Sequence, residues 1–94
     1  MNNYISLASL SMDLKRAALG YYGNSKEMAE CFYQEALRRK EEIDIKSVSP
    51  YLVNLLDKVD QLKKVNGNLE KAEIAHTLSI LFQNAAVTLA NNQK

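Results

Sequence analysis

The chain is poor in the residue types that build disulfide frameworks, metal centres and loop-rich folds. It contains one cysteine (Cys31), one histidine (His76), one proline, three glycines and no tryptophan. A lone cysteine excludes an internal disulfide bond and suits a reducing compartment. Because structural zinc sites need several Cys or His ligands, we expect no bound metal, and no motif in the sequence indicates a cofactor.

The sequence also lacks a large excess of either charge and any long apolar run. Twelve Lys and Arg stand against eleven Asp and Glu, which leaves a formal charge of +1. So small a net charge gives no long-range attraction to nucleic acids or anionic membranes. Polar residues interrupt the most apolar stretch, 74–90, so no run reaches the ~18 apolar residues of a membrane span. The N-terminal segment lacks the features of a signal peptide, and we therefore expect a cytoplasmic protein.

What the sequence does contain is helical periodicity over most of its length. No segment shows sustained two-residue alternation, and the glycines and the proline fall between helical patterns. We expect helices over about 3–19, 25–42, 50–66 and 69–91. Short connections between the first two helices and between the last two make each pair antiparallel neighbours. The sequence therefore predicts an all-α, up-down antiparallel four-helix bundle in a single domain, 1–94.

Cap residues set the expected helix boundaries. The segment Gly20–Asn24 should end the first helix, and Asn24 with Glu27 resembles a capping box at the start of the second. Ser49 should cap the third helix ahead of Pro50. Gly67 should end that helix, because glycine tolerates the left-handed conformation found there.

Each expected helix carries an apolar stripe that should face the core. We also expect helical ion pairs between Glu35 and Arg39 and between Asp60 and Lys64. The predicted core stripes are Leu7, Leu10, Leu14, Ala17, Ala18 and Tyr21; Ala29, Phe32, Tyr33, Ala36, Leu37 and Ile43; Leu52, Leu55, Leu56, Val59 and Leu62; and Ile74, Leu78, Leu81, Phe82, Ala85 and Leu89.

The fourth helix has a second apolar stripe, and this is the most informative feature of the chain. At about 100° per residue, Ile80 and Val87 fall opposite the core stripe, beside Ala72, His76 and Gln83. The apolar residues of the first helix likewise span a wider arc around the helix than contact with a single core requires. The sequence therefore predicts a homodimer interface made by Ile5, Met12, Leu19, His76, Ile80, Gln83 and Val87.

Two short basic clusters give an alternative. Arg38, Arg39 and Lys40 end the second helix, and Lys63 and Lys64 end the third. Cations at helix C-termini interact favourably with the helix dipole, which accounts for their positions without a ligand. A dimer that aligned two clusters could instead bind nucleic acid.

The sequence Ala75-His76-Thr77-Leu78 resembles the surroundings of the phosphorylated histidine in histidine-phosphotransfer domains. The resemblance implies a helical bundle with His76 as phosphoacceptor. Those domains usually carry Lys and then Gly three and four residues after the histidine, where this chain has Ser79 and Ile80. We keep this as a second alternative. The favoured hypothesis is a non-catalytic interaction or regulatory module that binds itself and a further protein.

Overall fold

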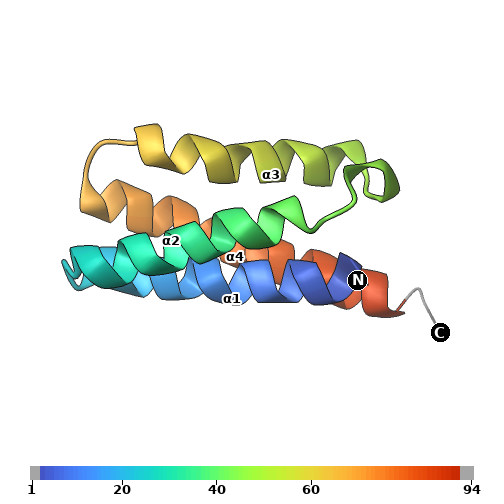
Figure 1. Cartoon of the computed structure of the whole chain (residues 1–94), viewed down its shortest axis with the longest axis horizontal. Helices are drawn as coiled ribbons and strands as arrows, with labels where there is room; N and C mark the ends of the chain where they lie inside the picture. Colours follow the sequence, from blue (N-terminus) through green and yellow to red (C-terminus); the bar gives the residue numbers. More distant parts are fainter. Residues whose placement is uncertain (1–2, 92–94) are drawn as a thin grey trace.

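Four α-helices and two short 3₁₀ turns make up the part of the chain that the computed structural model describes, residues 3–91. The helices alternate in direction, so that the turns between α1 and α2 and between α3 and α4 lie at one end of the bundle (Figure 1). The up-down four-helix bundle predicted from the sequence is confirmed. The elements are α1 (Asn3–Tyr22), α2 (Lys26–Glu41), η1 (Ile45–Ser47), α3 (Pro50–Gln61), η2 (Leu62–Lys64) and α4 (Asn68–Asn91).

Three of the predicted helix boundaries are wrong. α1 does not end at Gly20 but continues to Tyr22, with Gly20 buried inside the helix. The N-cap of α2 is Ser25, whose side chain accepts a hydrogen bond from the Met28 amide; Asn24 precedes it with a left-handed φ of 55°. The predicted cap of α3 is confirmed, since the Ser49 side chain accepts a hydrogen bond from the Leu52 amide. The predicted end of the third helix at Gly67 is wrong: α3 ends at Gln61, a 3₁₀ turn follows to Lys64, and the backbone is extended at Val65. Gly67, with a left-handed φ of 92°, directly precedes α4.

Most of the predicted core stripes are buried together. Leu10 and Leu14 on α1, and Phe82 on α4, are fully buried. The stripe of α4 is rotated from its predicted position, because Ala72, Ala75, Ser79 and Ala86 are buried whereas Ile74, Leu81, Ala85 and Leu89 are only partly buried. Placing Ala72 on the outer stripe was therefore wrong.

Small residues explain this rotation. The backbone of α1 runs close to those of α2 and α4 over much of its length, whereas α3 approaches α2 and α4 at few positions. The Ser11 hydroxyl on α1 donates to the Ser79 carbonyl on α4 across 2.7 Å, within this close contact. A Cβ on Gly20 would lie 2.6 Å from the Ala29 amide nitrogen of α2. Small side chains let helix axes approach, and the bulkier inner face of α3 keeps it further out.

Polar contacts tie α3 to α2. The Tyr33 hydroxyl on α2 donates to the Val59 carbonyl on α3 across 2.7 Å. The Lys40 ammonium lies 3.0 Å from the Asp60 carboxylate, so the predicted pair of Asp60 with Lys64 is replaced by an interhelical one. The other predicted pair is also wrong, because Glu35 pairs with Arg38.

Within residues 3–91, no helix is both long enough and apolar enough to cross a lipid bilayer.

Candidate interaction surface

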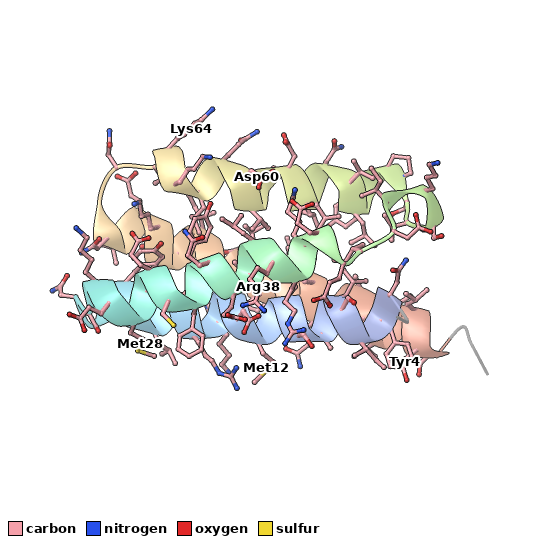
Figure 2. The ribbon with its side chains drawn as sticks, in the orientation of Figure 1. Tyr4, Met12, Met28, Arg38, Asp60 and Lys64 are labelled. Atoms are coloured by element: carbon pink, nitrogen blue, oxygen red, sulfur yellow. The ribbon has the colours of Figure 1, made fainter. Side chains whose placement is uncertain are left out.

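The side chains predicted to form an interface lie together on the outer surface of α1 and α4. We call this surface the α1/α4 face. Its apolar members are each about half exposed, from 45% for Ile5 to 55% for Leu19. Met12 points out from α1 on the side away from α3 (Figure 2). The face consists of Ile5, Met12 and Leu19 on α1, and of His76, Ile80, Gln83 and Val87 on α4, all of them exposed.

Antiparallel packing brings the two apolar rows to the same levels. Ser11 bonds to Ser79, so their chain neighbours Met12 and Ile80 lie within one helical turn of each other along the bundle axis. A step of two turns along each helix, in opposite chain directions, then brings Ile5 near Val87 in the same way. The apolar residues of α1 recur at heptad spacing, as do those of α4. Heptad spacing keeps side chains on one line along a helix and is typical of helix–helix seams.

His76 lies on the α1/α4 face as an exposed residue. Its carbonyl accepts a hydrogen bond from the Ser79 hydroxyl across 2.6 Å. In the described part of the chain no three His, Cys, Asp or Glu side chains gather as metal ligands would. The contacts of His76 are therefore those of a surface residue next to Ile80.

We expect His76→Ala to leave the fold unchanged. An exposed side chain contributes little, so the free energy of unfolding should change by less than about 0.5 kcal/mol. Urea denaturation followed by circular dichroism measures this change. Stoichiometric phosphate transfer to the wild type from a phosphorylated response regulator, abolished in His76→Ala, would instead make His76 a phosphoacceptor.

The basic cluster on α2 is largely paired within the chain. Arg38 lies 2.8 Å from the Glu35 carboxylate, and Arg39 lies 3.4 Å from that of Glu42. Lys40 is engaged with α3, and Lys63 and Lys64 are exposed in η2, directly after that helix. A phosphate backbone would have to compete with these carboxylates, so the arrangement does not favour nucleic-acid binding.

Asp13 is the buried carboxylate of the bundle, 7% exposed between α1 and α2. Its Oδ2 atom lies 3.8 Å from Nε of Arg39, and neither atom has a hydrogen-bond partner among the described residues. Burial raises the pKa of the Asp13 carboxyl above its ordinary value, against the opposing charge of Arg39. The carboxylate is thus costly to ionise in the folded state.

Asp13→Asn should therefore gain stability relative to the wild type as the pH rises. A carboxyl whose folded pKa is raised binds its proton more tightly in the folded state, so its contribution is present at low pH and lost as the pH rises through the folded pKa. Urea denaturation of both proteins at about pH 3 and pH 7 tests the sign, because this window brackets the ordinary Asp value of ~3.9. If the free energy of unfolding of the wild type instead rose relative to that of Asp13→Asn between these two pH values, the prediction would be contradicted.

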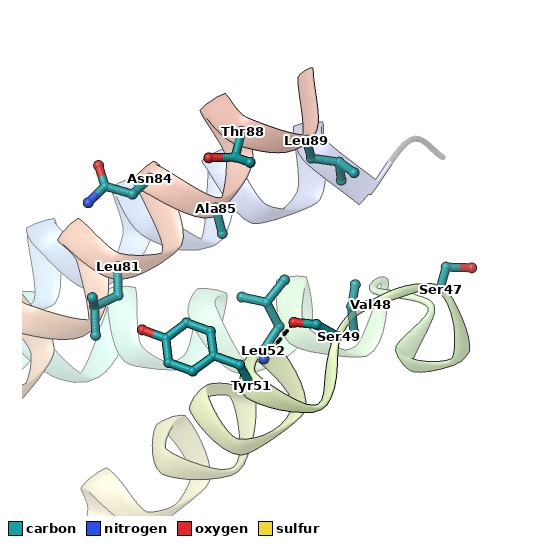
Figure 3. Close-up of a pocket in the computed structure, with 10 residues that line it drawn as sticks. All are labelled: Ser47, Val48, Ser49, Tyr51, Leu52, Leu81, Asn84, Ala85, Thr88 and Leu89. Carbon is teal, nitrogen blue, oxygen red and sulfur yellow. Dashed lines mark hydrogen bonds between the residues drawn. The ribbon is translucent and has the colours of Figure 1, made fainter. Parts of the chain in front are cut away.

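A cleft between α3 and α4 was not found from the sequence. It has a volume of about 460 Å³ and lies between the start of α3 and the C-terminal half of α4 (Figure 3). The one sequence signal is Ala85, which sits between Leu81 and Leu89 on the same helical row. A small residue in a row of leucines on α4 leaves a gap opposite α3, which approaches α4 closely at few positions. The lining residues are Ser47, Val48, Ser49, Tyr51, Leu52, Leu81, Asn84, Ala85, Thr88 and Leu89.

No protein-family model matches the chain, and no curated protein or solved structure is significantly similar to it.

Proposed function

We propose that this protein is a non-catalytic interaction module that forms a homodimer through the α1/α4 face. The observation that carries the proposal is a row of half-exposed apolar side chains, at heptad spacing, on two adjacent helices. Contiguous exposed apolar surface is costly in water and marks interaction sites. The most economical partner is a second copy, since two such rows can pack against each other around a two-fold axis.

The size of the face suits a modest dimer. With 20 residues α1 is long, so the α1/α4 pair presents roughly 30 Å by 20 Å, or about 600 Å². Stable interfaces bury about 800 Å² per partner. We therefore expect a dissociation constant on the scale of ~1 μM.

Charge on the face does not oppose pairing of two copies. Lys15 on α1 and Glu73 on α4 are exposed and have opposite signs, and by their helical angles they lie beside the apolar rows of the face. The neighbouring Arg16 is engaged elsewhere, 3.7 Å from Asp13 and stacked over the Phe32 ring. Opposite charges on the same face can pair across a two-fold axis, so they do not oppose the pairing of two copies.

Further parts of the proposal are a regulatory role and a cytoplasmic location. A dimer of small bundles can present its remaining surfaces to a further protein, whose binding would depend on the paired state. The free thiol of Cys31 is exposed, and exposed thiols persist best where thiols are kept reduced.

Ile80→Glu combined with Val87→Glu should give a folded monomer. Each carboxylate would be buried unpaired at the centre of a two-fold interface, which costs far more than exposing it on the monomer. Sedimentation velocity at protein concentrations from about 1 to 50 μM should show the wild type shifting to a dimer and the variant remaining a monomer. Circular dichroism checks that the variant keeps its helix content.

A matched control is Ile45→Glu combined with Val53→Glu. These are also exposed Ile and Val side chains, 58% and 37% exposed, but they lie on η1 and α3. The control adds the same charge away from the α1/α4 face and should dimerise like the wild type. A wild type that is monomeric at about 50 μM, weaker than the expected scale, would refute the proposal.

A further inference from the structure

We propose that the cleft between α3 and α4 binds a neutral small molecule with an apolar body and a hydrogen-bonding group at one edge. The inference does not rest on dimerisation, because the cleft is built on the side of α4 that faces α3, whereas α1 packs beside the other face of α4. Its volume of about 460 Å³ lies within the ~300–1,000 Å³ of small-molecule sites.

The chemistry of the lining defines the ligand. The walls are apolar, with Leu52, Leu81 and Ala85 pointing into the space between the helices (Figure 3). The polar lining groups are hydroxyls and a carboxamide, and no lining residue carries a charge. In a protein where charged residues make up 24% of the sequence, a lining without charge offers no ion-pair partner, so it favours a neutral ligand over an ion.

Several polar groups at the edge are available to a ligand. Within residues 3–91, no hydrogen bond engages the side chains of Tyr51, Asn84 or Thr88. Ser49 is not available in the same way, because its hydroxyl oxygen accepts from the Leu52 amide as the cap of α3. A carbonyl or amine on the ligand can therefore pair with Asn84 or Thr88 without breaking a contact of the fold.

The cleft is built into the fold. Tyr33 and Lys40 tie α3 to α2, and α3 approaches α4 closely at few positions, which leaves space between them. Ala85 supplies the missing volume, because a leucine there would continue the row of Leu81 and Leu89 and fill the space. Beyond Leu81 the next hollow along α3 and α4 carries Lys58 and Glu73, so the uncharged lining ends there. These limits favour a compact molecule over a long docked helix.

N-phenyl-1-naphthylamine is a suitable probe, because it is neutral, mostly apolar, carries one N–H donor and fluoresces more strongly in apolar surroundings. We expect saturable binding with one molecule per chain. Amide chemical shifts in a nitrogen-15 spectrum should change around Leu52, Leu81, Ala85 and Leu89. Ala85→Leu should weaken binding at least tenfold without lowering the melting temperature, since the new side chain fills the cleft with apolar atoms.

Ala8→Leu is the matched control, because Ala8 is an exposed alanine on α1 and the same substitution there should leave the affinity unchanged. The Ile80→Glu and Val87→Glu variant should also bind the probe like the wild type, which separates this site from the dimer face. Absence of saturable binding up to about 100 μM, a weak affinity on the usual scale, would overturn the proposal. So would shift changes confined to the α1/α4 face, or to the hollow at Lys58 and Glu73 where a helical peptide would dock. If Ala85→Leu fails to fold, the shift map of the wild type decides alone.

Discussion

Phe82→Ala is expected to lower the free energy of unfolding by about 3–5 kcal/mol, enough to unfold much of the protein. Phe82 is the largest side chain that is fully buried. It lies on α4 within the apolar core shared by the helices. Truncation removes its burial and leaves a cavity that helices in close contact cannot collapse to fill. Urea denaturation measures the loss.

Phe32→Ala provides the comparison for this prediction. Phe32 on α2 is only partly buried, and one of its ring faces lies under the Arg16 guanidinium, 5.5 Å from the ring centroid. The same truncation at this position leaves a hollow open to water rather than a closed cavity, so it should cost clearly less. Equal losses for the two variants would mean that Phe82 is not at the centre of the core.

Gly20→Val should be the second most damaging change, at about 3 kcal/mol, the upper end of the usual cost of overpacking. The first added carbon would meet the amide nitrogen of Ala29 at 2.6 Å and its Cα at 2.8 Å. Both are backbone atoms of α2, which cannot move aside without separating the helices. The variant should lose both thermal stability and the close contact between α1 and α2.

Gly23→Val is the control, because a Cβ at Gly23 would meet the Leu19 carbonyl at 3.4 Å, an ordinary contact. Thermal unfolding of both variants tests the comparison. If Gly20→Val and Gly23→Val have the same melting temperature, then α1 and α2 are not held at the distance that Gly20 permits.

Periodicity and caps were enough to predict the bundle, because leucine stripes and the Ser49–Pro50 signal act within one or two turns of the chain. They failed at Gly20, where glycine usually breaks a helix but here serves a contact with α2. They failed again at Ala72, which is buried because α1 packs closely on that side of α4. Both errors concern distances between helices, which no single helix encodes.

The α1/α4 face and the cleft between α3 and α4 also differ in how far the sequence alone predicts them. The exposure of Ile80 and Val87 was predictable, because it follows from their angle on one helix. Whether the α1/α4 face pairs with a second copy stays a prediction. The cleft was not predictable, since it depends on α3 approaching α4 closely at only a few positions. A single alanine at position 85 is a weak signal until the spacing of those helices is known.

The most direct test of self-association through the α1/α4 face is a search for nuclear Overhauser effects between protomers. The sample mixes carbon-13-labelled and unlabelled chains, and isotope filtering retains only contacts that cross the interface. We expect crossing contacts from the methyl groups of Met12, Leu19, Ile80 and Val87, and none from Ile45 or Val53. A dimer whose crossing contacts came instead from Leu52 and Leu81, or a sample with no crossing contacts at all, would contradict the account.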